Sequence, residues 1–328
     1  MSDDRSGQPT LADVGEDGLL AAIFPRLPHA AGTLVGPGDD TAVVNAPDGR
    51  VVATTDVLVE GRDFRRDWSS AQDVGWKAAA QNLADVAAMG AVPTALLVGL
   101  VAPPELEVSW AVGLADGLAA ACSGTGAGVV GGDLSSGPLI VVSVTALGDL
   151  QGRDPVLRSQ ARPGEVVAVA GPLGRSAAGW ELLRLGRGDV AAELVAAHRR
   201  PTPPYASGVV AAVAGATSML DVSDGLGRDL GRIARASGVG INLDGWLADA
   251  SAFPELLAAA QVLSDPSLVL SWVLGGGEDH CLVATFPADA TLPDGFDRIG
   301  EVIPATGPAP VLLDGEPLDT LGWDHFRP

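Results

Sequence analysis

The sequence predicts an α/β protein of the α+β kind with two domains, and three observations support this. The chain has 328 residues, enough for two hydrophobic cores. β-Branched runs of strand length alternate with segments of helical spacing. A polar stretch at 148–165 separates two such series. We therefore expect a flexible tail at 1–17, an N-terminal domain at 18–148 and a C-terminal domain at 149–328.

The first domain is predicted as a mixed sheet with helices on one face. The runs 41–45 and 51–56 flank the turn residues Pro47-Asp48-Gly49 and suggest a hairpin. Ser69 or Ser70 can cap a helix that runs to about Met89, with Gly90 behind it. The remaining elements are strands at 94–101, 128–132 and 139–147 and a helix at 105–123.

The second domain is predicted as an α/β domain. Ser223 or Asp224 follows a short apolar run and can cap a helix that ends near Gly238. The other predicted elements are strands at 166–170, 219–222, 239–243, 281–286 and 298–303, a hairpin at 311–318, and helices at 175–186, 189–198 and 205–214.

Composition excludes several classes of protein. The formal net charge of −21 argues against nucleic-acid binding, which needs basic patches. No apolar run reaches the roughly 18 residues of a membrane span. The polar N-terminus does not resemble a secretory signal, and Cys122 and Cys281 lie in apolar surroundings typical of core residues. We therefore expect a cytoplasmic protein that binds neither membrane nor nucleic acid.

Common nucleotide and zinc motifs are absent. There is no G-x-x-x-x-G-K-[ST] loop, no protein-kinase signature and no H-E-x-x-H pair. Gly124, Gly126 and Gly128 follow a predicted helix and precede a strand, the reverse of a dinucleotide fingerprint. They are interpreted as a turn.

Aspartates recur at the ends of apolar runs and beside glycine turns. Magnesium prefers oxygen ligands and is usually held by one or two carboxylates plus substrate phosphates. Bare carboxylates about 4 Å apart repel by about 4 kcal/mol at an effective dielectric near 20, so a cluster would need cations. A magnesium–nucleotide site is therefore the leading interpretation. The recurring aspartates are Asp40, Asp56, Asp85, Asp133, Asp221 and Asp224.

Each segment alone also has a structural interpretation. Gly132-Asp133 after an apolar strand could bring backbone N–H groups to a phosphate, or could be a simple turn. Asp221, Ser223 and Asp224 could hold a cation at a helix N-terminus, or could only cap the helix. An aspartate at position 85 among apolar neighbours could bind a cation or form a buried salt bridge.

The order of the segments is more specific than any one of them. Taken together they resemble the thiamine-monophosphate kinase family, within the ATP-binding superfamily of aminoimidazole-ribonucleotide and selenophosphate synthetases. The resemblance covers residues 36 to 323. It rests on GDDTAVV, TTDVLVEGRDF, KAAAQNLADVAAMGA, GGDLSSGP, RSQARPGE, HRRPTPPY, LDVSDGLGRDL, GGGEDH and the final GW.

The resemblance implies the two-domain synthetase-superfamily fold and transfer of the ATP γ-phosphoryl group to thiamine monophosphate with several Mg²⁺ ions. It also implies a homodimer formed through the N-terminal sheets. Asp133 and Asp224 are the candidate catalytic residues. The implied metal ligands are Asp40, Thr54, Thr55, Asp56, Asp85, Asp133, Asp221 and Asp224. The implied nucleotide contacts are Gly132, Arg158 and Ser223, and the implied thiamine contacts are Glu278 and Trp323.

One position departs from the family pattern. The family motif E-G-x-H-F appears here as Glu60-Gly61-Arg62-Asp63-Phe64, so a carboxylate replaces a histidine that contacts substrate. Asp63 is kept as a substrate-site residue, with the alternative that it has turned away. Two rival functions stay open: another ATP-dependent synthetase of the superfamily, and a non-catalytic nucleotide-binding maturation protein.

Overall fold

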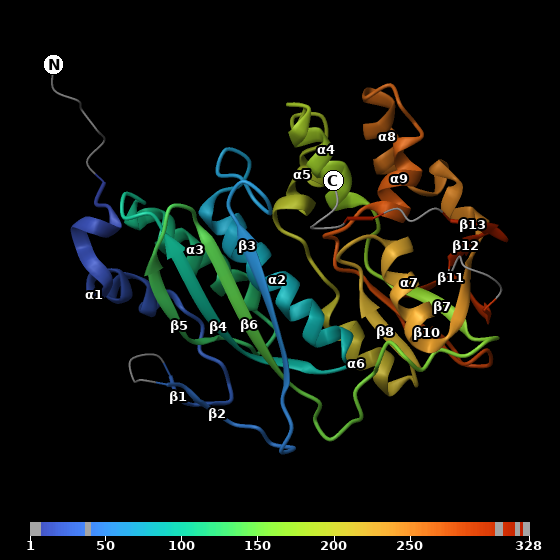
Figure 1. Ribbon diagram of the computed structural model, residues 1–328, viewed down its shortest axis with the longest axis horizontal. Coiled ribbons are helices and arrows are strands. Elements are labelled where there is room, and N and C mark those ends of the chain that lie inside the picture. Colours follow the sequence, from blue (N-terminus) through green and yellow to red (C-terminus); the bar gives the residue numbers. More distant parts are fainter. Residues whose placement is uncertain (1–7, 37–40, 306–310, 319–321, 324–328) are drawn as a thin grey trace. The chain divides into compact units, whose positions relative to one another are not determined.

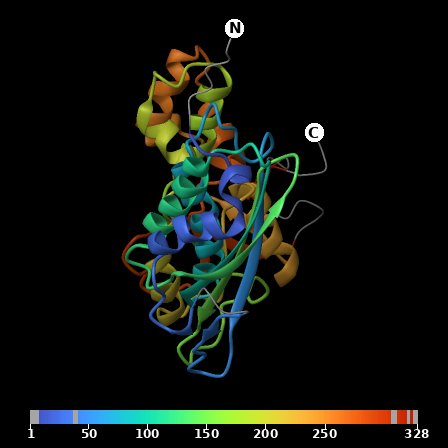
Figure 2. The same ribbon diagram turned by 90° about the vertical axis from the view of Figure 1, so that its left-hand side faces the viewer.

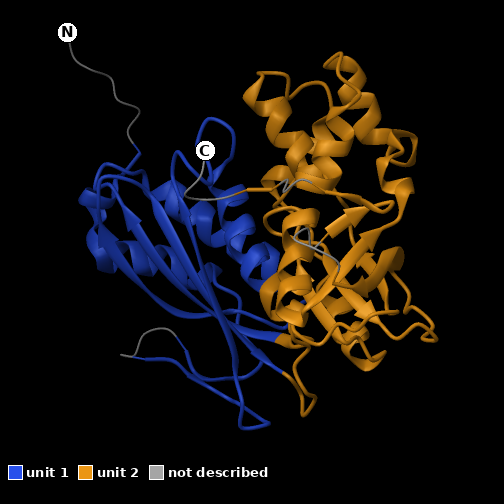
Figure 3. Ribbon diagram, turned by 45° about the vertical axis from the view of Figure 1, so that its right-hand side comes forward, with its two compact units in different colours: residues 1–83, 93–149 blue, residues 84–92, 150–328 orange. Residues whose placement is uncertain are grey.

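The computed structural model describes residues 8–36, 41–305, 311–318 and 322–323, and the chain forms two compact units (Figures 1 and 3). Unit 1 comprises residues 1–83 and 93–149, and unit 2 comprises residues 84–92 and 150–328. The helix α2 (Ala71–Ala88) therefore begins in unit 1 and ends in unit 2. The sequence-based boundary between 148 and 149 does not foresee this exchange of residues 84–92.

Unit 1 contains a four-stranded mixed sheet in the order β3-β6-β4-β5. The edge strand β3 is antiparallel to β6, whereas the opposite edge strand β5 is parallel to β4. The predicted mixed sheet is thus confirmed. The strands are β3 (Val52–Val59), β4 (Val92–Ala102), β5 (Val129–Ser136) and β6 (Val141–Asp149).

Helices lie on one face of this sheet, as predicted (Figures 1 and 2). They are α1 (Leu11–Ile23), α2 and α3 (Val108–Cys122). Ser70 caps α2, because its Oγ accepts from the Asp73 N–H at 3.2 Å while Asp73 accepts from the Ser70 N–H. The helices α2 and α3 approach so closely that a Cβ at Gly75 would lie 2.1 Å from the Leu114 carbonyl oxygen.

Two expectations for the N-terminal region differ from the structure. Residues 11–17 belong to α1, which is kinked at Gly15, where the sequence suggests a tail. Asp13 accepts from the Thr10 N–H at 2.8 Å and closes a capping box at the start of this helix. The predicted hairpin is wrong. The turn at 46–50 exists, but β2 (Val43–Val44) pairs with β1 (Thr33–Val35), and β3 pairs with β6.

Unit 2 contains a seven-stranded mixed sheet in the order β13-β12-β9-β11-β7-β10-β8. Only the β12–β9 pair among these is parallel. The strands are β7 (Val166–Ala170), β8 (Ser218–Asp221), β9 (Val239–Leu243), β10 (Leu282–Phe286), β11 (Phe296–Pro304), β12 (Val311–Leu313) and β13 (Glu316–Pro317).

Helices cover both faces of the second sheet. One core joins α6 and the last turn of α2 to Ala168, Met219 and Ala284, and a larger core joins the other helices to Val167 and Val283. In the described part of the chain, no helix has the length and apolar character needed to span a membrane. The helices are α4 (Arg175–Arg184), α5 (Ala192–Arg199), α6 (Tyr205–Val213), α7 (Leu226–Ser237), α8 (Pro254–Val262) and α9 (Leu268–Gly275), with 3₁₀ turns at Phe24–Arg26, Gly245–Ala248 and Ala250–Ala252.

Candidate active site

The predicted site residues fall into two groups, one in each unit, and each group is described by itself. Asp40 lies outside the described residues. Unit 1 carries Thr54, Thr55, Asp56, Asp63, Gly132 and Asp133. Unit 2 carries Asp85, Arg158, Asp221, Ser223, Asp224, Glu278 and Trp323.

The threonine-aspartate run lies on the edge strand β3. The Thr55 hydroxyl donates to the Val144 carbonyl oxygen at 3.0 Å and lies 3.1 Å from the Thr145 hydroxyl, which ties it to β6. The Asp56 N–H donates to Oδ1 of the buried Asn82 at 3.1 Å, so α2 also holds this strand. The backbone is therefore well anchored where Asp56 presents its carboxylate.

The Gly132-Asp133 pair lies on the opposite edge strand, β5. A Cβ at Gly132 would lie 1.9 Å from the Val98 carbonyl oxygen, so only glycine fits at this position. The side chain of Asp133 is exposed. The glycine requirement thus has a packing cause in the sheet itself, apart from any approach to phosphate.

Asp56 and Asp133 point to opposite faces of the sheet. Val57 pairs with Ser143, a Cβ at Gly99 would lie 3.7 Å from the Ser143 Cβ, and Gly99 pairs with Asp133. These four residues share one face because paired residues point the same way, and Asp56 points to the other face because successive residues alternate. One copy of this sheet therefore does not bring Asp56 and Asp133 together.

Asp63 closes a tight turn after β3. Its Oδ2 accepts from the Val59 N–H at 2.8 Å, and its own N–H donates to the Val59 carbonyl oxygen at 2.9 Å. Arg65 pairs with Asp67 at 2.7 Å and Arg66 pairs with Glu60 at 2.6 Å. One oxygen of Asp63 therefore holds the local turn.

In unit 2, the loop after β8 lies against the loop after α9. The Ser223 carbonyl oxygen accepts from the Glu278 N–H at 3.0 Å, and the Val222 carbonyl oxygen accepts from the His280 N–H at 3.1 Å. The Asp224 carbonyl oxygen accepts from the Trp323 N–H at 2.9 Å. Backbone hydrogen bonds thus bring together five predicted site residues from three distant segments: Asp221, Ser223, Asp224, Glu278 and Trp323.

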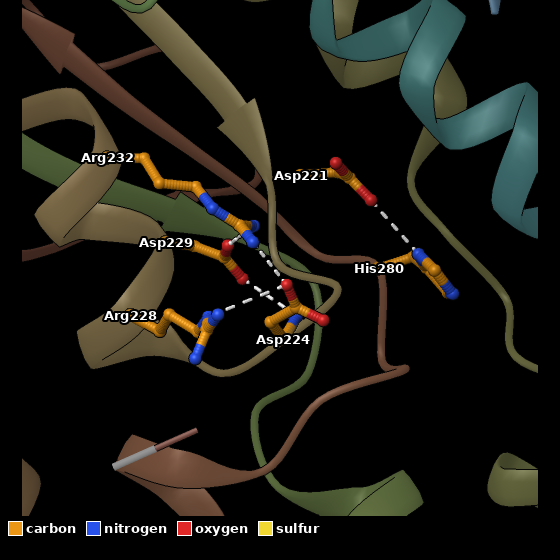
Figure 4. A network of polar contacts seen from close by, with 6 residues as sticks. All are labelled: Asp221, Asp224, Arg228, Asp229, Arg232 and His280. Carbon is orange, nitrogen blue, oxygen red and sulfur yellow. Dashed lines mark hydrogen bonds and ion pairs between the residues drawn. The ribbon is translucent and has the colours of Figure 1, made fainter. Parts of the chain in front are cut away.

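Asp221 is buried at the end of β8 beside a histidine. Its Oδ2 lies 3.0 Å from Nδ1 of His280, and both side chains are buried (Figure 4). Burial alone would lower the pKa of His280, but the hydrogen bond and charge of Asp221, with the charges of Glu278 and Asp85, outweigh burial and raise it. The carboxylates around His280 therefore favour its protonated form.

Asp224, at the start of α7, is held by two arginines. Its Oδ2 contacts Arg232 and lies 3.8 Å from Nε of Arg228, while its N–H donates to Oδ2 of the fully buried Asp229 at 2.9 Å (Figure 4). Burial raises the pKa of Asp229 to about 7, although Arg232 opposes the shift. The second predicted carboxylate of this loop is thus already paired with cations.

The remaining predicted residues of unit 2 are more peripheral. Asp85 is half-buried on α2, and Arg158 is exposed, with its carbonyl oxygen accepting from the Ser237 hydroxyl at 2.9 Å. Trp323 exposes 51% of its surface.

A preformed metal cage is not part of the described structure. Among the described residues, no three His, Cys, Asp or Glu side chains are grouped closely enough to hold a metal ion. Asp221 and Asp224 nevertheless offer hard oxygen donors on one loop. Such a donor set fits magnesium that takes most of its ligands from phosphates and water, and does not fit an all-protein site.

Comparisons with known proteins show which family this chain is similar to. The family models for the N-terminal and C-terminal domains of AIR synthase related proteins match residues 38–150 and 162–262. A thiamine-monophosphate kinase of Mycobacterium tuberculosis is 51% identical over 97% of this chain and 93% of its own length. The Corynebacterium glutamicum enzyme of that name is 40% identical over 97% of this chain and 95% of its own.

The chain belongs to the thiamine-monophosphate kinase family.

Solved structures extend the likeness to the fold of this family. A structure of AaThiL complexed with AMPPCP and TMP is 33% identical, covers 98% of this chain and 100% of its own, and has a TM-score of 0.76. The Escherichia coli hydrogenase maturation protein HypE, at 19% identity and a TM-score of 0.68, shares the fold alone. The predicted two-domain synthetase-superfamily fold is confirmed.

Several polar residues of this thiamine-monophosphate kinase family member are not foreseen from its sequence. His280 and the pair Arg228 and Arg232 contact predicted site carboxylates, and His198 on α5 lies 3.4 Å from Oε2 of Glu278. The position of His280 directly after Glu278-Asp279 is a usable signal. His198 has no comparable signal, because its contact depends on how α5 packs.

Proposed function

We propose that this protein transfers the γ-phosphoryl group of ATP to thiamine monophosphate. An oxygen of the acceptor phosphate forms a bond to the γ-phosphorus, the bond between that phosphorus and the bridging oxygen breaks, and ADP and thiamine diphosphate leave. The second pKa of a phosphate monoester is about 6, so the acceptor is largely ionised near neutrality. No general base is needed, and catalysis consists of positioning and charge neutralisation.

The pairing of the loop 221–225 with the loop 277–281 is the observation that carries this proposal. It joins the candidate magnesium ligands Asp221 and Asp224 to Glu278, a candidate thiamine contact, at the N-terminus of α7. The AaThiL relative complexed with AMPPCP and TMP holds an ATP analogue and TMP on a similar fold. Residues proposed to hold magnesium and phosphate are thus joined to a residue proposed to contact thiamine. This arrangement suits an acceptor whose phosphate is attached to a ring system.

Magnesium is the proposed partner of the carboxylates. When bound, Mg²⁺ would supply positive charge that neutralises the phosphates. The residues proposed to hold it, all oxygen donors, are Asp40, Thr54, Thr55, Asp56, Asp85, Asp133, Asp221 and Asp224. We propose Asp133 and Asp224 as the catalytic residues, and Gly132, Arg158 and Ser223 as contacts of the nucleotide.

The thiamine part is proposed to bind at Glu278 and Trp323. The indole of Trp323 offers a flat surface to a cationic thiazolium, where cation–π attraction is worth about 1–2 kcal/mol when desolvated. Glu278 offers a carboxylate to the amino group of the pyrimidine. Asp63 stays in the proposed substrate group through Oδ1, because the structural turn uses Oδ2.

The decisive experiment supplies purified protein with ATP, Mg²⁺ and thiamine monophosphate and separates the products by chromatography. We expect ADP and thiamine diphosphate in equal amounts, and neither product when thiamine replaces its monophosphate. ADP with inorganic phosphate but without thiamine diphosphate would favour a synthetase. ATP binding without any turnover would favour a maturation protein.

We also propose a homodimer that forms through the N-terminal sheet. Among the described residues of unit 1, no helix covers the face of the sheet that carries Val57, Leu97 and Asp133 (Figure 2), and Val57 and Leu97 expose 50% and 38% of their surfaces. A second copy would bury this apolar area. A cytoplasmic location is proposed because ATP is the co-substrate.

A further inference from the structure

Three consecutive residues of the loop after α9 are each anchored to a different element. They are Glu278, Asp279 and His280, named here the clamp. The side chain of Glu278 reaches His198 on α5, that of Asp279 reaches the N-terminus of α4, and that of His280 reaches Asp221 at the end of β8. The function proposed above uses Glu278 alone and leaves the three anchors unexplained.

The backbone of the clamp is in an uncommon conformation. Glu278 has a φ of 63° and His280 a φ of 53°, in the left-handed region that residues other than glycine seldom adopt. Two residues on either side of Asp279 adopt this strained conformation, which persists only where the surrounding structure holds the backbone in place. Such positions concentrate at functional sites. The hydrogen bonds of the clamp to the loop after β8 provide that restraint.

Asp279 is the buried centre of the clamp. Its Oδ1 accepts from the Ser176 N–H at 2.8 Å, where α4 begins. Its Oδ2 is buried and makes no hydrogen bond within the described part of the protein. The carboxylate therefore ties the loop to the start of α4.

Ser176 and His198 connect this buried centre to Glu278. The Ser176 hydroxyl lies 3.1 Å from Nδ1 of His198, and the same Nδ1 lies 3.4 Å from Oε2 of Glu278. An ionised carboxylate only accepts hydrogen bonds, so the contact with Glu278 is attractive when Nδ1 carries the proton. His198 is buried, whereas the side chain of Glu278 is 38% exposed. Nδ1 of a buried histidine thus lies beside one oxygen of a carboxylate whose side chain is partly exposed.

We infer that His198 is a positioning residue for thiamine monophosphate, acting through Glu278. This role of His198 rests on the proposed function, because Glu278 is the proposed thiamine contact. With Oε2 held by His198, Oε1 is kept oriented toward the amino group of the pyrimidine. Because the contact involves a charged group, loss of His198 should weaken binding of the acceptor about ten- to hundred-fold.

The test compares two substitutions at one position. Asn Nδ2 and His Nδ1 are the same number of bonds from Cα, so His198→Asn keeps a donor near the same place, while His198→Leu removes it. We expect His198→Leu to raise the KM for thiamine monophosphate about ten- to hundred-fold with less than about a three-fold change in the KM for ATP. We expect His198→Asn to restore most of the loss.

A double-mutant cycle separates positioning from general damage. If His198 acts through Glu278, then His198→Leu should add little to the loss already caused by Glu278→Gln. Fully additive effects, or equal increases in both KM values, would overturn the inference. Should His198→Leu fail to fold, Ser176→Ala keeps the backbone bond to Asp279 and should give a smaller rise in the same KM. An unchanged KM in Ser176→Ala would then count against the inference.

The inference and the proposed function fail in different ways. Wild-type protein that neither turns over nor binds thiamine monophosphate, as measured by calorimetry, overturns both. Wild-type protein that makes thiamine diphosphate while His198→Leu retains its KM values overturns the role of His198 alone.

Discussion

Carboxylates in this protein are distinguished by what surrounds them. Asp133 is exposed at a sheet edge, Asp224 is paired with two arginines, and Asp279 is buried with one oxygen lacking a hydrogen bond among the described residues. Only exposed or exchangeable carboxylates can gain a cation without first losing a protein partner. Asp133 is therefore the most accessible of the three for a metal-bridged phosphate.

Replacing Asp133 with Asn should lower turnover about a hundred-fold or more, because it removes a ligand charge directed at a metal-bridged phosphate. The fold should survive, since the side chain is exposed. Steady-state kinetics at saturating Mg²⁺ measures the effect. Ser135→Ala, two residues along the same face of β5, is the matched control and should stay near wild type. Full activity in a folded Asp133→Asn protein would remove Asp133 from the site.

Asp279 should make stability depend on pH. Burial raises its pKa from 3.8 to about 7, so the folded protein binds this proton more tightly than the unfolded chain. The free energy of unfolding therefore falls as pH rises from about 4 to about 7, and by at most about 3 kcal/mol between pH 5 and pH 7 from this group. Urea unfolding at both pH values measures the fall.

Asp279→Asn removes the titrating group and should flatten this pH dependence. Asp229, with a pKa of about 7 and the same direction of shift, stays in both proteins and cancels in the comparison. Identical slopes for wild type and variant between pH 5 and pH 7 would show that Asp279 does not titrate in the folded protein as its burial implies.

At the scale of elements, glycines decide how closely helices and strands approach. Gly75 and Gly117 let α2 and α3 touch through their backbones, since a Cβ at either would lie 2.1 Å from a carbonyl oxygen of the other helix. Helix propensity favours Ala over Gly by about 1 kcal/mol in a helix interior. The tertiary contact overrides that preference here.

Gly75→Ala should therefore destabilise the protein by about 1–2 kcal/mol net, because forced backbone separation costs more than the gain in helix propensity. Gly231→Ala on α7 is the contrasting control. A Cβ there would meet the flexible end of Arg235 at 3.1 Å, so that substitution should be neutral or stabilising. Denaturant unfolding of both variants tests the contrast, and a stabilised Gly75→Ala protein would contradict it.

Local signals predict most of the elements, whereas pairing between distant segments is beyond them. The cap at Ser70 and the ends of α2 and α7 at Gly90 and Gly238 have φ values and hydrogen bonds that match their turn chemistry. The hairpin prediction fails because strand pairing is set by packing across the sheet, and Val52 pairs with Gly148 instead.

In the candidate site, too, local patterns are visible in the sequence, whereas contacts between distant segments are not. The aspartates at strand ends and the glycine turns are visible as a pattern in the sequence. The opposite orientation of Asp56 and Asp133 follows only from the register of four strands. His198 depends on the packing of α5, which no spacing in the sequence reveals.

At the scale of the whole molecule, the helix-free sheet face of unit 1 sets the expected assembly. Light scattering at micromolar concentration should give twice the chain mass of 33.0 kDa. Val57→Asp should shift the protein toward monomer, because a charge at this apolar position would be desolvated in the dimer. Val213→Asp on α6, where the valine is 73% exposed, should leave the dimer intact. A monomeric wild type would refute the proposal.

The passage of residues 84–92 into unit 2 limits how this chain can be divided. Ala87 and Ala88 belong to a core of unit 2, and the Met89 carbonyl oxygen accepts from the Val156 N–H at 3.1 Å. A fragment that ends at residue 150 carries these residues away from their core, and the fragment 151–328 lacks part of its own interior. Expressed alone, each fragment should be prone to aggregate. Expressed together, the two fragments should complement one another, because the end of α2 can then pack into the hydrophobic core to which it belongs.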